Sequence, residues 1–246
     1  MSLLSFHWQD VLEEGRRERQ FLESVIPLKY LLNDEVCVAG SRALQWWQAE
    51  MNAGPYWNRP GDIDIFVAGE PGKNDATFGE FLYDVRRNMG KKGFLCTSEW
   101  REGPCTDDCT DDCIHSEKLK IIDVNVEGFK FKFSFVQRPR AKNNEEVVAS
   151  FDLDICRVIY DLRRHSFQVK DEVQDHIRSG VAIVAADRLK DDSLDEGNGS
   201  EDPLDEENWK KRMTLKRMRK YQRRGFTIVK EDGKVLAKST TGAGGS

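Results

Sequence analysis

The chain has 246 residues, of which 39% are hydrophobic and 33% charged, and its formal net charge is -5. These values suit one sizeable α/β core with or without an appendage, and they argue against a nucleic-acid-binding surface that covers the whole chain. No apolar run reaches the roughly 18 residues that span a bilayer, and the start of the chain lacks the layout of a secretion signal. We therefore expect a soluble, cytoplasmic protein that makes no membrane contact and whose six cysteines are reduced.

The first part of the chain is predicted to be helical and to lead into a strand. Apolar residues at helical spacing, broken at Pro27, predict one or two helices in residues 1–34, which we interpret as a lead-in. Residues 35–39 have the apolar character of a short buried strand. Gly40 and Ser41 end that strand before a further predicted helix.

The main domain is expected to occupy residues 35–186. Its predicted elements after the first strand are a helix at 42–51, strands at 62–67 and 94–98, a helix at 75–89 between them, a hairpin of 119–127 and 129–137 around Gly128, a short helix at 143–149, a strand at 151–160, a helix at 173–177 and a strand at 181–184. This order predicts an α/β (α+β) fold in which helices flank a mixed sheet.

Three segments differ in composition from this domain. Residues 101–118 are polar, contain a tandem Cys-Thr-Asp-Asp repeat and are interpreted as an inserted loop. Residues 187–208 are acidic and rich in small polar residues, so we predict a linker or a disordered loop there. Residues 209–246 begin strongly basic and helical and end in a tail that we expect to be flexible.

Two acids one residue apart on a strand are the main chemical signal. Because side chains alternate along a strand, Asp62 and Asp64 are expected to point to one side while Ile63 and Ile65 point to the other. Two neighbouring carboxylates repel each other unless a cation lies between them, and ligation by oxygen alone suits Mg²⁺ or Mn²⁺. Such ions activate a hydroxyl and neutralise a leaving group in nucleotidyl transfer.

The Gly40-Ser41 break supplies a second part of the predicted site. Glycine lets the backbone approach a ligand closely, and the first amides of the following helix can bind a phosphate. Each signal alone is common in proteins without such a site. Their order along the chain is more specific.

That order resembles the polymerase β-like nucleotidyltransferase superfamily, through Val38-Ala-Gly-Ser41 and Asp62-Ile-Asp-Ile65. Further motifs resemble the nucleotidyltransferase-like proteins of large DNA viruses and some protists. These motifs are Trp57 before Gly61-Asp-Ile-Asp-Ile-Phe-Val67, Phe151-Asp-Leu-Asp-Ile-Cys156 and Lys220-Tyr-x-x-Arg-Gly-Phe226. The resemblance covers roughly residues 35 to 226. It implies the fold, metal binding by Asp62 and Asp64, and nucleotide contact at Gly40 and Ser41.

The chain departs from that superfamily in its third carboxylate. The superfamily has an acid on a strand beside the Asp-x-Asp strand, whereas the predicted strand 129–137 contains none. Asp152 is our choice for the third catalytic acid because it lies in a motif that resembles the family. Asp123 on the first hairpin strand and Asp154 beside Asp152 are the alternatives, and a purely structural role for Asp152 stays open.

A cysteine cluster and a basic helix raise two further hypotheses. Cys105, Cys109, Cys113 and His115 could ligate zinc, although their spacing is not that of a common zinc motif. The basic helix at 209–226 could contact RNA or a protein acceptor. Alternatively, it could pack its apolar residues on the core while its cations face solvent or pair with the acidic segment just upstream.

The sequence as a whole predicts a nucleotidyltransferase. It would move a nucleotidyl group from a nucleoside triphosphate such as ATP to an unidentified hydroxyl with Mg²⁺ or Mn²⁺. The alternatives are a catalytically inactive regulator of the same fold that binds nucleotide or nucleic acid, and a zinc-stabilised interaction module built on the cysteine loop.

Overall fold

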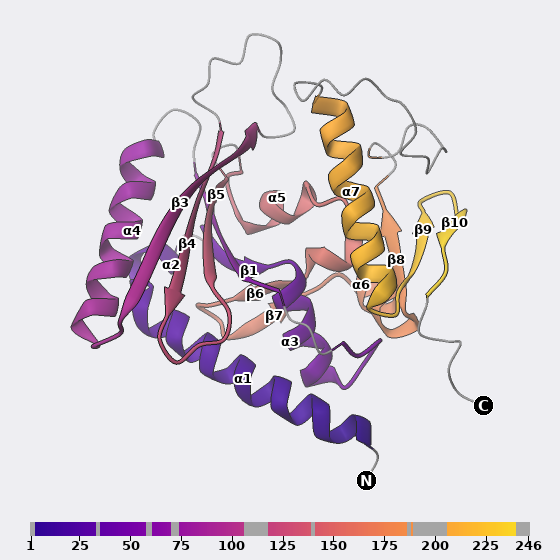
Figure 1. The fold of residues 1–246 in the computed structure, drawn as a ribbon, viewed down its shortest axis with the longest axis horizontal. Helices are drawn as coiled ribbons and strands as arrows, with labels where there is room; N and C mark the ends of the chain where they lie inside the picture. Colours follow the sequence, from indigo (N-terminus) through magenta and orange to yellow (C-terminus); the bar gives the residue numbers. More distant parts are fainter. Residues whose placement is uncertain are drawn as a thin grey trace. The chain divides into compact units, whose positions relative to one another are not determined.

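The computed structural model of the chain describes residues 3–32, 35–57, 61–69, 74–105, 118–138, 141–185, 188 and 206–239 (Figure 1). The chain divides into two compact units, each assembled from separate stretches. The first unit comprises Met1–Asn52, Arg59–Ser150 and Cys156–Val169, and the second comprises Ala53–Asn58, Phe151–Ile155 and Lys170–Ser246.

The first unit is built on a seven-stranded mixed sheet with the strand order β3-β4-β5-β2-β1-β6-β7. Its strands are β1 Val36–Ala39, β2 Ile63–Ala68, β3 Cys96–Cys105, β4 Lys118–Val126, β5 Phe133–Arg138, β6 Ile159–Asp161 and β7 Ser166–Gln168. Only the pair of β2 and β5 is parallel. Its helices are α1 Leu3–Val25, α2 Leu28–Leu31, α3 Ser41–Met51, α4 Asn74–Lys91 and α5 Asn144–Ala149. The predicted α+β fold with a mixed sheet and flanking helices is confirmed.

Apolar side chains fix which face of this sheet the helices α1 and α4 cover. Phe21 of α1 lies 4.7 Å from Phe133, and Phe81 of α4 lies 5.9 Å from Phe135, between ring centroids. The β2 residues that pair with these two phenylalanines, Ile63 and Ile65, are fully buried. Because side chains alternate along each strand, the intervening residues of β2 and β5 point to the other face.

The predicted lead-in is part of this first unit. Helix α1 ends at Val25, and Pro27 begins the short helix α2, so the predicted interruption at that proline is confirmed. Leu22 and Val25 are fully buried, which means that α1 contributes to the core. The helix is therefore integral to the unit that carries the Asp-x-Asp strand.

The described residues of the second unit form a three-stranded sheet, in the order β10-β9-β8, and two helices. These elements are α6 Asp171–Ser179, β8 Val181–Val184, α7 Glu206–Arg223, β9 Thr227–Lys230 and β10 Val235–Ala237. Helix α7 is the predicted basic helix. The two strands after it were not predicted, since we expected only a flexible tail there.

Two further expectations differ from the structure. The predicted strand at 151–160 is instead a single bridge at Leu153, a 3-10 turn Asp154–Arg157 and the short strand β6. Asp154 explains the change, because its carboxylate accepts backbone hydrogen bonds from Ile155 and Ile183, both at 2.7 Å. Strand β3 also extends to Cys105, so the inserted loop begins later than expected. Among the helices of the described ranges, none combines the length and apolar character needed to cross a bilayer.

Candidate active site

The two acids of the Asp-x-Asp motif lie at the start of β2, and their side chains point away from the core. Asp62 directly precedes the strand, and its side chain is 46% exposed. Asp64 lies within the strand and is partly exposed, whereas its neighbours Ile63 and Ile65 are fully buried. Both carboxylates therefore belong to the sheet face that α1 and α4 do not cover.

Sheet register extends this face across two more strands. Asp64 on β2 pairs with Ser134 on β5, and Ser134 pairs with Asp123 on β4. Directly paired residues point to the same face, so these three residues form one row, which we call the carboxylate row. The Ser134 hydroxyl donates to Asp123 Oδ1 at 2.7 Å. A buried serine thus occupies the β5 position beside Asp64, and the nearest acid in the row is one strand further away.

Lys132 connects the carboxylate row to Asp62. Its Nζ atom lies 2.8 Å from Asp123 Oδ2 and 3.3 Å from Asp62 Oδ2. The hydrogen bond to Asp123 is the main reason that the pKa of Lys132 is raised above its ordinary value, and the negative charge of Asp62 adds to it. The ammonium therefore stays charged and neutralises part of the carboxylate repulsion. Alternation along the predicted strand 129–137 puts Lys132 on one face with Ser134, but no role at the site was assigned to it, and in the structure it directly precedes β5.

The predicted Gly40-Ser41 break lies beside Asp64. Gly40 has a φ of 78°, which disfavours any residue with a side chain, and its amide donates to the Cys156 carbonyl at 3.1 Å. A Cβ atom built on Gly40 would be 3.7 Å from Asp64 Oδ2. The backbone at the start of α3 and the Asp64 carboxylate are thus close neighbours.

The first turn of α3 offers backbone amides at this place. The bond from the Leu44 amide to the Gly40 carbonyl is the first of the helix, so the amides of residues 41–43 have no partner within α3. No side chain caps this end of the helix. Ser41 is buried, with 7% exposure, and begins the helix. Free amides and the positive end of the helix dipole favour an anion here.

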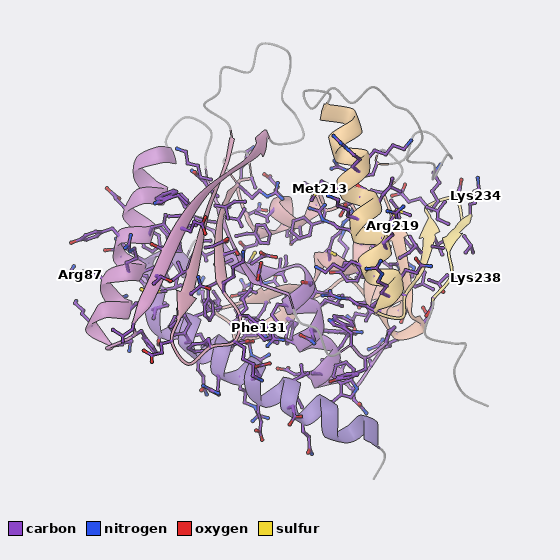
Figure 2. The ribbon with its side chains drawn as sticks, in the orientation of Figure 1. Arg87, Phe131, Met213, Arg219, Lys234 and Lys238 are labelled. Atoms are coloured by element: carbon purple, nitrogen blue, oxygen red, sulfur yellow. The ribbon has the colours of Figure 1, made fainter. Side chains whose placement is uncertain are left out.

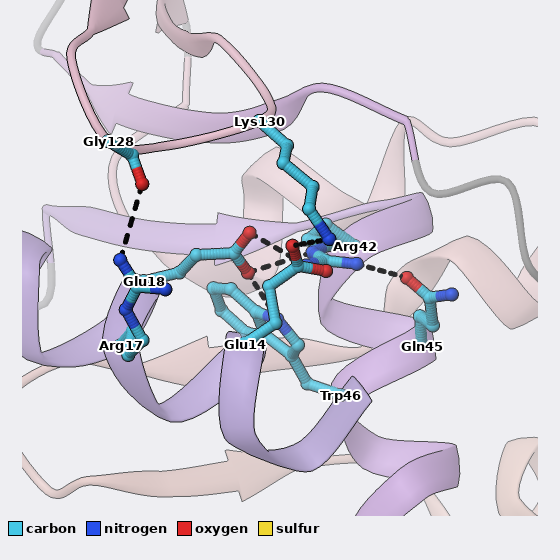
Figure 3. A network of polar contacts seen from close by, with 8 residues as sticks. All are labelled: Glu14, Arg17, Glu18, Arg42, Gln45, Trp46, Gly128 and Lys130. Atoms are coloured by element: carbon cyan, nitrogen blue, oxygen red, sulfur yellow. Dashed lines mark hydrogen bonds and ion pairs between the residues drawn. The ribbon is translucent and has the colours of Figure 1, made fainter. Parts of the chain in front are cut away.

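Arg42, the second residue of α3, connects the start of that helix to α1 (Figure 3). Its guanidinium is fully buried and lies 2.7 Å from Glu18 Oε1 and 3.1 Å from Glu14 Oε2, both on α1. Trp46 Nε1 also donates to Glu18 at 3.0 Å, and Arg42 donates to Gln45 as well. Burial raises the pKa of Glu18, while its hydrogen bond with Arg42 opposes that rise.

The same network reaches the turn between β4 and β5. Lys130 Nζ lies 3.3 Å from Glu14 Oε1, and Arg17 donates to the Gly128 carbonyl at 3.2 Å. Helix α1 is thereby connected to the start of α3 and to the hairpin turn that precedes Lys132. The α1 residues of this network were not singled out in the sequence, where an acidic pair four residues apart was their only signal.

Asp152, the predicted third acid, lies in the second unit. It is buried, with 4% exposure, and its Oδ2 atom accepts from Thr214 at 3.1 Å and from Arg217 at 2.7 Å. Both donors belong to α7, so the carboxylate holds that helix to the stretch Phe151–Ile155. The structure therefore assigns Asp152 a contact within its own unit and brings Asp123, the alternative acid, into the carboxylate row.

The donor set of the site fits a hard divalent cation held by few protein ligands. Asp62 and Asp64 offer carboxylate oxygens, the donors that Mg²⁺ and Mn²⁺ prefer, and the ammonium of Lys132 shows that a cation is already accommodated between carboxylates here. In the described part of the chain, no group of three or more histidine, cysteine, aspartate or glutamate side chains is arranged to hold a metal ion. Water and ligand phosphates would have to complete the coordination.

Of the four residues of the predicted cysteine cluster, the structure describes Cys105 alone. Cys105 ends β3, and Cys109, Cys113 and His115 lie outside the described residues. The zinc hypothesis therefore stays a prediction. Cys37 and Cys156 are buried, and neither forms a disulfide among the described residues.

Comparisons with known proteins give no family for this chain. No protein-family model matches it, and no curated protein matches it significantly.

Proposed function

We propose that this chain is a metal-dependent nucleotidyltransferase of the polymerase β-like class. It moves a nucleotidyl group from a nucleoside triphosphate to a hydroxyl acceptor and releases pyrophosphate. The observation that carries the proposal is the position of Asp64 in the carboxylate row, one residue from the start of β2 and beside Gly40 at the head of α3. This arrangement offers carboxylates for a cation next to amides for the phosphates that the cation accompanies.

Each residue then has a role that follows from its environment. Asp62 and Asp64 hold the divalent ion, which when bound lowers the pKa of a coordinated hydroxyl and neutralises charge on the leaving group. The amides of residues 41–43 and the Ser41 hydroxyl bind phosphate oxygens. Gly40 leaves room for the triphosphate, because any side chain there would extend toward Asp64.

Asp123 is better placed than Asp152 to act on the proposed site, although its role there is indirect. It shares the sheet face of Asp64 and contacts the same ammonium as Asp62, whereas Asp152 is engaged by Thr214 and Arg217. Asp123 is two strands from Asp64, so the two backbones are about 10 Å apart. We therefore assign it to charge balance and to the orientation of Ser134 and Lys132.

A second candidate function is supported by two specific observations. A serine occupies the β5 position next to Asp64, and Lys132 already neutralises Asp62 and Asp123. Both features suit a protein that binds a nucleotide with its cation and does not turn it over. This candidate shares the site and differs only in the chemical step.

The test separates binding from turnover. Wild-type protein is titrated with each nucleoside triphosphate in the presence of Mn²⁺, and pyrophosphate release is then followed with RNA, protein and small hydroxyl acceptors. Asp64→Asn is expected to lose nucleotide affinity by at least about tenfold, because one of two carboxylate ligands becomes neutral. Asp175→Asn is the matched control, since Asp175 is an exposed aspartate on α6.

Four results decide between the proposals. Turnover that Asp123→Asn abolishes and Asp152→Asn spares supports the assignment of Asp123. The opposite pattern returns that role to Asp152. Nucleotide binding without turnover for any acceptor supports the inactive binder, and equal nucleotide affinity in wild type and Asp64→Asn overturns the site.

A further inference from the structure

The second unit carries a concentration of positive charge that the net charge of the chain conceals. Residues 206–239 contain twelve lysines and arginines and four acids, although the whole chain has a formal charge of -5. These residues form α7 and the β9–β10 hairpin. The question is whether the cations are scattered around these elements or gathered on one surface.

Helix α7 separates its apolar and basic residues onto different faces. Leu215, Met218 and Tyr221 are 6%, 3% and 1% exposed and belong to the core of the unit. The exposed cations that share a different face, at spacings of four, three and four, are Arg212, Lys216, Arg219 and Arg223. Residues at these spacings are neighbours on one side of a helix. We call this set the basic stripe, and at 1.5 Å per residue it is about 16 Å long.

Within the described residues, the acids of the unit leave most of the basic stripe without an ion pair. Asp152 pairs with Arg217, which lies off the stripe. Across the described ranges, Arg212, Lys216 and Arg223 have no hydrogen-bond or ion-pair partner. Three positive charges thus remain exposed along one line of the helix.

The β9–β10 hairpin adds cations at the end of the stripe. Gln222 Nε2 of α7 donates to the Lys238 carbonyl at 2.9 Å, which brings the end of the helix beside the residue that follows β10. Lys234 and Lys238 are exposed on this hairpin, and Figure 2 labels both of them together with Arg219 on α7. The positive surface therefore continues beyond the helix.

The chemistry of this surface favours a polyphosphate over an anionic membrane. A helix that lies on a membrane needs an exposed apolar face, whereas the apolar face of α7 is buried in its own unit. Val235 is the only large hydrophobic residue of the second unit that is strongly exposed among the described residues. Among the side chains of this unit that the structure describes, none is an exposed aromatic on which bases could stack, which favours recognition through the phosphates.

We propose that the basic stripe and the adjoining β9–β10 hairpin bind the phosphate backbone of a nucleic acid. The stripe places successive cations about 4.5 and 6 Å apart along the helix axis, which allows several phosphates of one strand to be contacted together. This inference does not rest on the proposed nucleotidyl transfer, since none of its residues belongs to the site in the first unit.

Fluorescence anisotropy with labelled oligonucleotides tests the proposal, with single-stranded RNA, duplex RNA and duplex DNA as separate arms. The R212Q/K216Q/R223Q variant removes the three stripe cations that have no partner among the described residues. We expect it to bind more than about tenfold more weakly than wild type at about 0.1 M salt, and to lower the slope of log affinity against log salt by about three. The three arms identify which nucleic acid binds best.

The matched control removes the same charge from a different helix. R86Q/R87Q/K91Q neutralises three exposed cations of α4, one of which, Arg87, is labelled in Figure 2, and should leave affinity within about twofold of wild type. Circular dichroism establishes that both variants are folded. No binding by wild type in any arm, an equal loss in the control, or binding to phosphatidylserine vesicles without binding to oligonucleotides would each overturn the proposal. Loss of nucleotidyl transfer in Asp64→Asn with unchanged oligonucleotide affinity would leave it intact.

Discussion

Lys132 sets the charge of the carboxylate site before any divalent ion arrives. Its ammonium contacts Asp62 and Asp123, so a metal ion that binds Asp62 meets a resident positive charge a few ångströms away. A unit charge at about 4 Å contributes from about 1 kcal/mol in water to about 4 kcal/mol near a protein surface. Because Asp62 is nearly half exposed, the lower part of that range applies.

The first prediction at this scale concerns Lys132→Met. We expect the variant to bind Mn²⁺ at least about fivefold more tightly than wild type, because the competing cation is removed. Electron paramagnetic resonance of free Mn²⁺ measures the affinity directly. Lys130→Met is the control, since it removes the same charge from Glu14, and it should bind Mn²⁺ as wild type does. An affinity in Lys132→Met that equals or falls below the wild-type value contradicts the role of Lys132.

The residues also show how far the sequence alone could lead. Alternation along a strand was enough to predict that Asp62 and Asp64 leave the core while Ile63 and Ile65 enter it. The position of Asp123 was not predictable in the same way, because it depends on the strand order β4-β5-β2 and on the register of both pairs. A motif likewise could not reveal that Asp152 pairs with a helix more than sixty residues later.

At the scale of elements, α1 supports two parts of the candidate site. Glu18 and Glu14 hold Arg42 at the head of α3, and Glu14 also contacts Lys130 before β5. A buried charge that loses its partner is costly, so this network fixes the orientation of α3 relative to the hairpin. The helix has this role although it contributes no residue to the proposed chemistry.

We expect Glu18→Gln to lower the free energy of unfolding by about 1 to 3 kcal/mol, because Arg42 and Trp46 donate to both carboxyl oxygens of Glu18 and the amide nitrogen of glutamine cannot accept a hydrogen bond. Urea unfolding at several pH values measures the loss. Burial raises the pKa of Glu18, so the stability that its carboxyl contributes is fully present below its ordinary pKa of 4.5 and is lost as pH rises through the raised pKa. The cost of the substitution should therefore be largest in acid.

The control for this prediction lies on the same helix. Glu13 is exposed, and Glu13→Gln should change the free energy of unfolding by less than about 0.5 kcal/mol at every pH. A cost of Glu18→Gln that grows as pH rises would contradict this prediction. It would show that the contacts of ionised Glu18 with Arg42 contribute more free energy than burial of the charge costs.

The predicted elements failed where a side chain or a turn decided the local structure. The composition of residues 151–160 is typical of a strand. The Asp154 carboxylate, however, accepts hydrogen bonds from the amides of Ile155 and Ile183, and the chain forms a 3-10 turn at this point. Asp232-Gly233 is a sequence typical of hairpin turns, and it connects β9 to β10 with Gly233 at a φ of 85°. The glycine and serine residues of the following tail favoured a flexible segment over a hairpin, so the hairpin was not predicted.

At the scale of the whole molecule, the two units are predicted to respond separately to core substitutions. Trp57 is 6% exposed, and its ring lies 6.0 Å from that of Phe226 and 6.5 Å from that of Tyr221. The Arg224 guanidinium lies 4.9 Å from the Trp57 ring centroid. This single residue of the stretch Ala53–Asn58 thus fills the core of the second unit.

Trp57→Ala should destabilise the second unit by about 3 to 5 kcal/mol, the usual cost of removing a buried aromatic side chain. Hydrogen exchange is the measurement, and we expect faster exchange of the amides in α7 and β9 while those in α4 keep their protection. Trp100→Ala is the control because Trp100 is 59% exposed. Equal loss of protection in α4 and α7 would mean that the units unfold as one.

The way in which the second unit is assembled has a consequence for synthesis on the ribosome. Two of its three stretches, Ala53–Asn58 and Phe151–Ile155, are translated before the last stretch begins at Lys170. A nascent chain that has reached Val169 therefore contains every residue of the first unit, while Trp57 and Leu153 still await the helix and strands that will bury them. The first unit can fold early. The second unit can fold only when two earlier segments of the chain pack against its last stretch, and such contacts between distant residues form slowly. Until then its apolar side chains stay exposed and can be bound by chaperones.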